Sequence, residues 1–206
     1  MGIDISPMET NLILRNLSKH IELTDDEKEI FCSSLKIKKV KRHQFLGEAG
    51  EVSRYQNFVT KGCIRSYYND ENGFEHNVQF AIEDWWIGDM ASFLTKKPAS
   101  LYIEALESSE VLQLDNPAME ELYIRIPKLE RFFRILLQNA FIAFEQRIIS
   151  VISKTAEERY LEFINKYPQL ELRLPQIHIA SYLGITPEFL SKIRKKILKD
   201  SSKNLK

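Results

Sequence analysis

The residues with the clearest potential for chemistry are the cations near the end of the chain. Residues 175–197 read PQIHIASYLGITPEFLSKIRKKI, and within them Leu190, Ile193 and Ile197 recur at steps of three and four. This spacing places the apolar residues on one side of a helix and leaves basic and polar residues on the other. A row of cations on the free side of a helix can bind phosphate groups. The stretch therefore predicts an anion-binding helix surface.

A tight turn and a first helix must position this surface. Gly184 accepts a positive φ, Thr186 suits an N-cap, and Pro187 suits the first helical position. A short helix is expected from Gln176 to Leu183. Its apolar side would consist of Ile177, Ala180 and Leu183. Two short helices joined at a glycine, the second of them basic, predict a helix-turn-helix that binds double-stranded DNA. The alternative is an ordinary helical hairpin with a solvated charged face.

The predicted second helix would present its first half to base edges and its other cations to phosphates. The expected base contacts are Thr186, Glu188, Ser191 and Lys192. The expected backbone contacts are Gln176, Arg194, Lys195, Lys196 and Lys199.

The net charge of zero hides an uneven distribution. From Pro175 onward seven basic residues face two acidic ones, a net charge of +5, whereas residues 1–174 hold 22 basic and 27 acidic residues, a net charge of −5. Charges more than about 10 Å apart are screened at ordinary salt. A neutral chain can therefore hold a polyanion through a local basic patch.

The residues before this tail indicate a different architecture. From Leu35 to about Leu114, short runs rich in β-branched and aromatic residues alternate with glycine, asparagine and aspartate, which predicts an antiparallel β-barrel or jelly roll. Residues 8–31 are expected to be helical, with Thr24 and Glu27 as a capping box. The fold class is therefore expected to be α+β.

A long helix is predicted over residues 128–153, with two apolar rows. The heptad-spaced row is Leu137, Phe141, Phe144, Ile148 and Val151, and the row beside it is Leu129, Phe133, Leu136, Ala140 and Ala143. Two rows need two partners. Both rows could pack inside one subunit, but we expect the heptad row to form a homodimer. The apolar stretch Phe132 to Phe144 is expected to be too short and too polar to span a membrane.

Metal and cofactor chemistry is not expected. Cys32 and Cys63 lie in no metal-binding cluster, and they could form a disulfide or, as we expect, stay reduced. The four histidines form no ligand motif: His20, His43, His76 and His178. We therefore expect no catalytic residue, no bound metal and no cofactor. The N-terminus lacks the pattern of a signal peptide, which indicates a cytoplasmic protein.

Three stretches resemble the Crp/Fnr family of bacterial regulators, and the likeness covers most of the chain. "IASYLGITPEFLSKIRKKI" is similar to the DNA-binding element of the family, "GEAGEVSRYQNFVTKGCIRSYYNDENG" to its sensor barrel, and "WWIGDMASF" to its pocket entry. The resemblance implies a cyclic-nucleotide-binding-like barrel with flanking helices (1–127), a dimerisation helix (128–153) and a helix-turn-helix DNA-binding domain (154–206). It also allows RNA polymerase as a partner.

Departures from the family pattern concern the effector. Cyclic-nucleotide binders place a Gly-Glu pair on the ribose and, further on, an Arg-Ser or Arg-Thr pair on the phosphate. Here the first pair is Gly88-Asp89, followed by Met90, and Ala99-Ser100 stands where the arginine should be. Without a guanidinium, a buried phosphate lacks its bidentate partner. We therefore expect a degenerate pocket and an unidentified small-molecule effector other than cyclic AMP.

Two further departures qualify the resemblance. Residues 1–31 contain none of the cysteines that hold the iron–sulfur cluster in the Fnr branch, and the polar tail LKDSSKNLK indicates that the β-wing of the family is absent. Fewer phosphate contacts would weaken DNA binding and its salt dependence.

The leading hypothesis is a sequence-specific DNA-binding transcription regulator that senses an effector through its barrel. The alternative is a ligand-binding or protein-interaction module with a degenerate helix-turn-helix. An enzyme of the cupin type is not favoured, because only His43 and His76 lie in the barrel segment.

Overall fold

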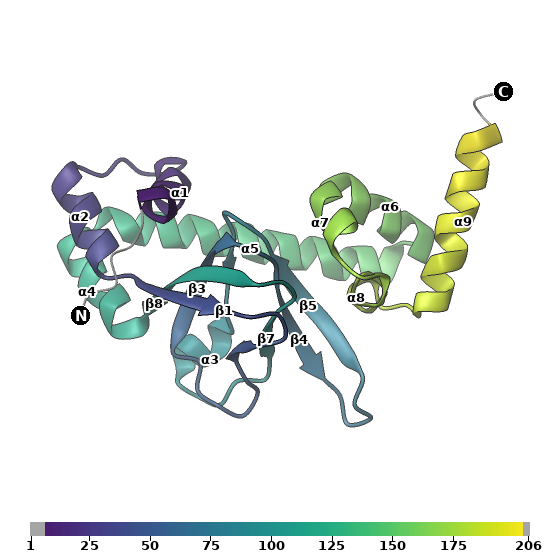
Figure 1. Cartoon of the computed structure of the whole chain (residues 1–206), viewed down its shortest axis with the longest axis horizontal. Helices are drawn as coiled ribbons and strands as arrows, with labels where there is room; N and C mark the ends of the chain where they lie inside the picture. Colours follow the sequence, from purple (N-terminus) through teal and green to yellow (C-terminus); the bar gives the residue numbers. More distant parts are fainter. Residues whose placement is uncertain (1–6, 204–206) are drawn as a thin grey trace. The chain divides into compact units, whose positions relative to one another are not determined.

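The computed structural model describes residues 7–203, which form helices, then strands, then helices again (Figure 1). In chain order the elements are α1 (Pro7–Ser18), α2 (Asp25–Ser33), β1 (Lys36–Val40), β2 (Phe45–Gly47), β3 (Tyr55–Lys61), β4 (Ile64–Asn69), β5 (Glu75–Ala81), β6 (Trp86–Ile87), α3 (Met90–Thr95), β7 (Tyr102–Ala105), β8 (Ser109–Asp115), α4 (Asn116–Arg125), α5 (Lys128–Ser153), α6 (Ala156–Lys166), α7 (Pro168–Arg173), α8 (Gln176–Leu183) and α9 (Pro187–Lys203). The predicted α+β class, with its antiparallel strands, long helix and C-terminal helices, is confirmed.

The strands form two four-stranded sheets that pack face to face. One sheet has the order β1-β8-β3-β6 and the other β2-β7-β4-β5. The strand pairs β1–β8, β8–β3, β3–β6, β2–β7 and β7–β4 are antiparallel. Side chains from both sheets meet in one apolar cluster between them, which includes Val59, Val111, Ile64 and Ile103. Two antiparallel sheets that meet in one apolar layer form the sandwich of a jelly roll, as the sequence predicts.

Helices cover the outer face of the first sheet. Phe58 and Leu112 on the strands pack in one buried cluster with Ile13 of α1, Leu122 of α4 and Phe132 of α5. The expected capping box of α2 is present, since Thr24 and Glu27 each bond the backbone of the other. The helices that flank the strands are therefore part of the same hydrophobic core.

Contacts divide the chain into two compact units. Unit 1 consists of Met1–Asn69 and Val78–Ala140, and unit 2 of Asp70–Asn77 and Phe141–Lys206. The helix α5 begins in unit 1 and ends in unit 2. Residues Asp70–Asn77, called the hairpin tip below, connect β4 to the start of β5 and belong to unit 2. The division expected at residues 127 and 153 stays a prediction.

Unit 2 contains the two helices and the turn predicted from the sequence. Gly184 ends α8 with φ at 68°, and the hydroxyl of Thr186 accepts the backbone N–H of Phe189 at 3.2 Å. One detail of the prediction is wrong: Ile177 is exposed, and Ile179 is buried in its place. Ile179 and Leu183 lie one turn apart, which aligns them, whereas Ile177 lies about 200° around the helix from Ile179.

Candidate functional site

The free face of α9 carries three lysines. Lys192, Lys195 and Lys199 are exposed, whereas Leu190 and Ile193 on the other side of the helix are buried. Within residues 7–203 none of these three lysines forms an ion pair. The sequence-predicted split of this helix into an apolar and a cationic face is thus present, and the cations are available to an anionic partner.

Two other cations of α9 are already paired inside unit 2. The guanidinium of Arg194 lies 3.4 Å from the carboxylate of Glu171 in α7, and the ammonium of Lys196 lies 2.6 Å from that of Glu157 in α6. The hydrogen bond and charge of Glu157 raise the pKa of Lys196 above its usual value. The roles of Arg194 and Lys196 as backbone contacts remain predictions, now with acidic competitors beside each of them.

The polar residues at the start of α9 stabilise its first turn. The exposed carboxylate of Glu188 bonds to its own backbone N–H and to the hydroxyl of Thr186, and these bonds lower its pKa. Thr186 and Gln176 are exposed and Ser191 is half-buried. Phe189 is also exposed here, and it lies outside the apolar row of Leu190, Ile193 and Ile197 from which the sequence predicts the core side of the helix.

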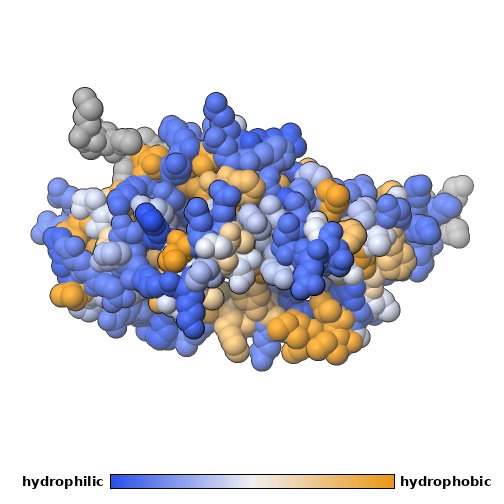
Figure 2. All heavy atoms as spheres, turned by 90° about the horizontal axis from the view of Figure 1, so that it is seen from below, coloured by the Kyte–Doolittle hydropathy of each residue, from blue (hydrophilic) through white to orange (hydrophobic). Residues whose placement is uncertain are grey.

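The heptad row of α5 lies on the surface. Its five residues are between 41% and 69% exposed: Leu137, Phe141, Phe144, Ile148 and Val151. Their neighbours Ile142, Ile149 and Ile152 are exposed too, and apolar atoms gather along the lower edge of Figure 2. The second row is buried at Leu129 and Phe133, exposed at Ala140 and half-buried at its last residue, Ala143. The two rows therefore differ in burial, and the heptad row forms an exposed apolar surface.

By length and composition, α5 could also cross a membrane. Its 26 residues include an 18-residue window with a mean hydropathy of 1.3, none of which is buried among the described residues. The prediction that Phe132 to Phe144 is too short to span a membrane concerns this stretch alone, whereas the whole helix is long enough. Length and composition are weak evidence, since soluble helices pass the same test.

The predicted effector residues belong to a segment whose backbone N–H groups donate hydrogen bonds to its own carboxylate, that of Asp89. The carboxylate of Asp89 accepts the backbone N–H of Ser92 at 2.9 Å, of Ser100 at 3.1 Å and of Leu101 at 3.3 Å. Asp89 and Ala99 are buried, Gly88 and Met90 are half-buried, and Ser100 is exposed. An internal carboxylate thus takes amide donors that could otherwise bind an anion.

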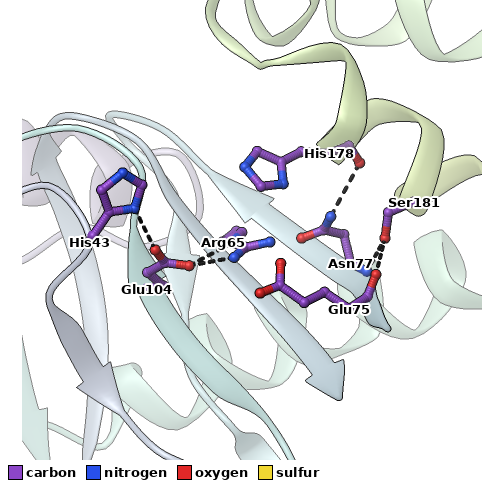
Figure 3. Close-up of polar contacts among 7 residues, drawn as sticks. All are labelled: His43, Arg65, Glu75, Asn77, Glu104, His178 and Ser181. Atoms are coloured by element: carbon purple, nitrogen blue, oxygen red, sulfur yellow. Dashed lines mark hydrogen bonds and ion pairs between the residues drawn. The ribbon is translucent and has the colours of Figure 1, made fainter. Parts of the chain in front are cut away.

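Hydrogen bonds join the hairpin tip to α8 within unit 2 (Figure 3). The backbone N–H of Asn77 donates to the hydroxyl of Ser181 at 2.9 Å, and the amide of Asn77 donates to the carbonyl of His178 at 3.2 Å. Arg147 of α5 donates to the carbonyls of Asn77 and Tyr182, both at 2.9 Å. The tip is therefore part of the body that carries α9, although its two ends continue into β4 and β5.

A buried ion pair in unit 1 was not foreseen from the sequence. Arg65 and Glu104, directly opposite each other on β4 and β7, are 4% and 5% exposed, and their side chains approach to 2.5 Å. The carboxylate of Glu104 also contacts the Nδ1 atom of His43 (Figure 3), and the two atoms are 2.7 Å apart. Burial raises the pKa of Glu104, but the bonds from His43 and Arg65 outweigh burial and lower it. Among the described residues no group of three potential ligands is placed to hold a metal ion.

Comparisons with known proteins agree with this architecture. Residues 37–125 match the family described as cyclic nucleotide-binding domain. The chain is 27% identical over 169 residues to the fumarate and nitrate reduction regulatory protein of Vibrio cholerae, covering 76% of this chain and 66% of that protein. It is 28% identical over 170 residues to the anaerobic regulatory protein of Haemophilus influenzae, covering 76% of this chain and 64% of that protein. The chain thus spans slightly less than two thirds of the length of these curated relatives.

A solved structure extends the likeness in fold to both units. The structure of FixK2 from Bradyrhizobium japonicum has a TM-score of 0.71 at 18% identity, covering 81% of this chain and 86% of that chain. The fold and the matches define the class: a cyclic-nucleotide-binding-type domain followed by a long helix and a helical C-terminal unit. Within this class the chain is similar to regulators of the Crp/Fnr family, as the sequence motifs predicted.

Proposed function

We propose that the chain is a homodimeric, sequence-specific DNA-binding regulator of transcription. It acts in the cytoplasm, without enzymatic activity of its own, and RNA polymerase is a further partner. The relatives are named as regulatory proteins, which supports this class. Its sandwich senses an effector, and a signal acts by favouring one arrangement of the two DNA-binding units over another.

The observation that carries the DNA-binding proposal is the cationic face of α9. Lys192, Lys195 and Lys199 follow one another along the exposed side of a helix that begins immediately after the Gly184 turn. A helix of this kind fits the major groove, with its first turns at the base edges and later lysines at phosphates. We assign Lys192 to guanine O6 and N7, and Lys195 and Lys199 to phosphate.

The effector is a molecule other than cyclic AMP. The carboxylate of Asp89 already occupies the backbone N–H groups of Ser100 and Leu101, and Ala99 offers no cation to a buried phosphate. Bringing a phosphate beside that carboxylate would place two negative charges together in a poorly solvated site, which is unfavourable. A neutral effector, or one held elsewhere in the sandwich, avoids this repulsion.

Selection of bound duplexes from a random-sequence pool tests the DNA-binding proposal. The full chain should enrich a palindrome whose half-sites lie about one helical turn apart, as two-fold symmetric dimers do. Lys192→Ala should broaden the enriched sequence, while Lys195→Ala should weaken all duplexes alike. Enrichment of no sequence over the starting pool would overturn the proposal and favour a protein-interaction module with a degenerate helix-turn-helix.

The dimer can be tested on the exposed row of α5. Ile148 is 61% exposed, and Ile148→Asp would bury an unpaired carboxylate in an apolar interface, so we expect at least about tenfold weaker dimerisation. Sedimentation velocity of the full chain measures it. Ile124→Asp is the matched control, because Ile124 on α4 is 82% exposed and lies outside the row. A wild-type monomer, or a chain that partitions into lipid vesicles, would contradict the proposal.

A further inference from the structure

One large apolar side chain stands among the polar residues at the start of α9. Phe189 is 49% exposed, whereas its neighbour Leu190 and Ile193, one turn further, are buried. The ring of Phe163 pairs with the rings of Tyr167 and Tyr182, and among the described residues no ring contacts Phe189. The hydrophobic core of the helical hairpin is therefore completed by other residues, and the ring is available at the surface.

The backbone of Phe189 is held in a defined position. Its N–H donates to the hydroxyl of the N-cap residue Thr186 at 3.2 Å, which makes Phe189 the third residue of the helix. Side chains in a helix lean toward its N-terminus. The ring therefore projects toward the end of α9 that, under the proposed function, enters the major groove first.

The residues around Phe189 fix the chemistry of its partner. Glu188 precedes it and Lys192 follows one turn later, so an acceptor and a cation flank the ring. The major-groove edges of adenine, guanine and cytosine present polar groups, and thymine alone adds a methyl group. An apolar side chain among polar readers of the groove matches that methyl group.

We propose that Phe189 reads thymine, by packing its ring against the C5-methyl group of one thymine in each half-site. This inference rests on the proposed function and adds a specificity-determining residue to it. Burial of one methyl group corresponds to a factor of about four in affinity, and two half-sites multiply this to about 15.

The test replaces thymine with deoxyuridine, which lacks only the methyl group. Each thymine of the selected duplex is replaced in turn, and the affinity of the full chain is measured by fluorescence anisotropy. At one thymine per half-site, wild type should lose about fourfold and Phe189→Ala less than twofold. Phe189→Leu, which keeps an apolar side chain, should remain sensitive to the methyl group.

Leu198→Ala is the matched control for losing an exposed apolar group. Leu198 is 67% exposed and lies nine residues after Phe189, on the opposite side of α9. It should respond to deoxyuridine as wild type does. The inference is overturned if wild type tolerates every replacement, or if Phe189→Ala and wild type lose affinity equally. Either result leaves the DNA-binding proposal intact, because that proposal fails only when no sequence is selected at all.

Discussion

The salt dependence of DNA affinity should reflect only those cations of α9 that form no ion pair within the protein. Each neutralised phosphate contributes about −0.9 to the slope of log K against log salt. If Lys195 and Lys199 contact phosphate and Arg194 and Lys196 stay with their carboxylates, a dimer neutralises four phosphates, for a slope of about −3.6. Eight phosphates, with all four cations engaged, would give about −7. Between 50 and 200 mM salt, affinity would fall about 150-fold in the first case and about 20,000-fold in the second.

Adjacent residues supply the matched variants. Lys195→Ala should flatten the slope by about two per dimer, whereas Lys196→Ala should leave it nearly unchanged, because the charge of Lys196 is already compensated by Glu157 at 2.6 Å. Glu157→Gln frees Lys196 and should steepen the slope by about two. Anisotropy titrations of one selected duplex at four potassium chloride concentrations measure each slope.

Two results would refute this reasoning. A wild-type slope near −7 would mean that the ion pairs open when DNA arrives, and so would an equal effect of Lys195→Ala and Lys196→Ala. Surface ion pairs are weak and screened by salt, so the outcome depends on whether phosphate or carboxylate is the better partner for the same cation. The Glu157→Gln variant separates these cases, because it removes only the competitor.

Three further outcomes are expected, all with the full chain. Glu104→Gln leaves a buried arginine without its counter-ion and should cost about 3–5 kcal/mol in urea unfolding, against less than about 1 kcal/mol for the more exposed Glu110→Gln. Since the pKa of Glu104 lies below its usual 4.5, its ionised carboxylate adds to the free energy of unfolding above pH 4.5, and this contribution is lost as pH falls through the lowered pKa. The Gln variant should lack this pH dependence. Gly62→Ala should destabilise more than Gly73→Ala, because both have positive φ but only at Gly62 would a Cβ lie 2.1 Å from another atom. Calorimetric titration with cyclic AMP should give no saturable heat, because Asp89 already accepts the backbone N–H groups of its segment.

Each of these three predictions has an outcome that would contradict it. Equal losses for Glu104→Gln and Glu110→Gln would mean that the buried pair contributes no more than a surface pair. Equal losses at the two glycines would assign the cost to backbone strain alone. Saturable heat with one cyclic AMP per subunit would show that the bonds of Asp89 yield to a phosphate.

Local patterns in the sequence predicted the elements of the candidate site, because helix caps and apolar periodicity act over a few residues. Thr24 and Gly184 were assigned their roles from neighbouring residue types, and the structure confirms both. The helix over residues 128–153 follows from its continuous apolar rows. Such features depend on the backbone of one segment, so a single sequence suffices to find them.

Contacts between distant segments could not be found in this way. Glu157 and Glu171 lie on helices before the turn, and nothing in their local sequence indicates that they neutralise Lys196 and Arg194. Arg65 on β4 is buried beside Glu104 on the neighbouring strand β7. These strands are neighbours only because of the strand order of the sheet, which local sequence does not reveal. Both cases require the tertiary arrangement.

The pairing of these cations makes the two candidate surfaces depend on each other. With Arg194 and Lys196 compensated, one α9 offers the three exposed lysines of its free face, of which one is assigned to a base. Two phosphate contacts give a single subunit a salt slope of only about −1.8, which corresponds to weak binding at physiological salt. Joining two subunits doubles the contacts and makes the second helix bind intramolecularly, which raises the effective concentration. A variant that separates the subunits at α5 should therefore lose specific DNA binding even though every residue of α9 is intact.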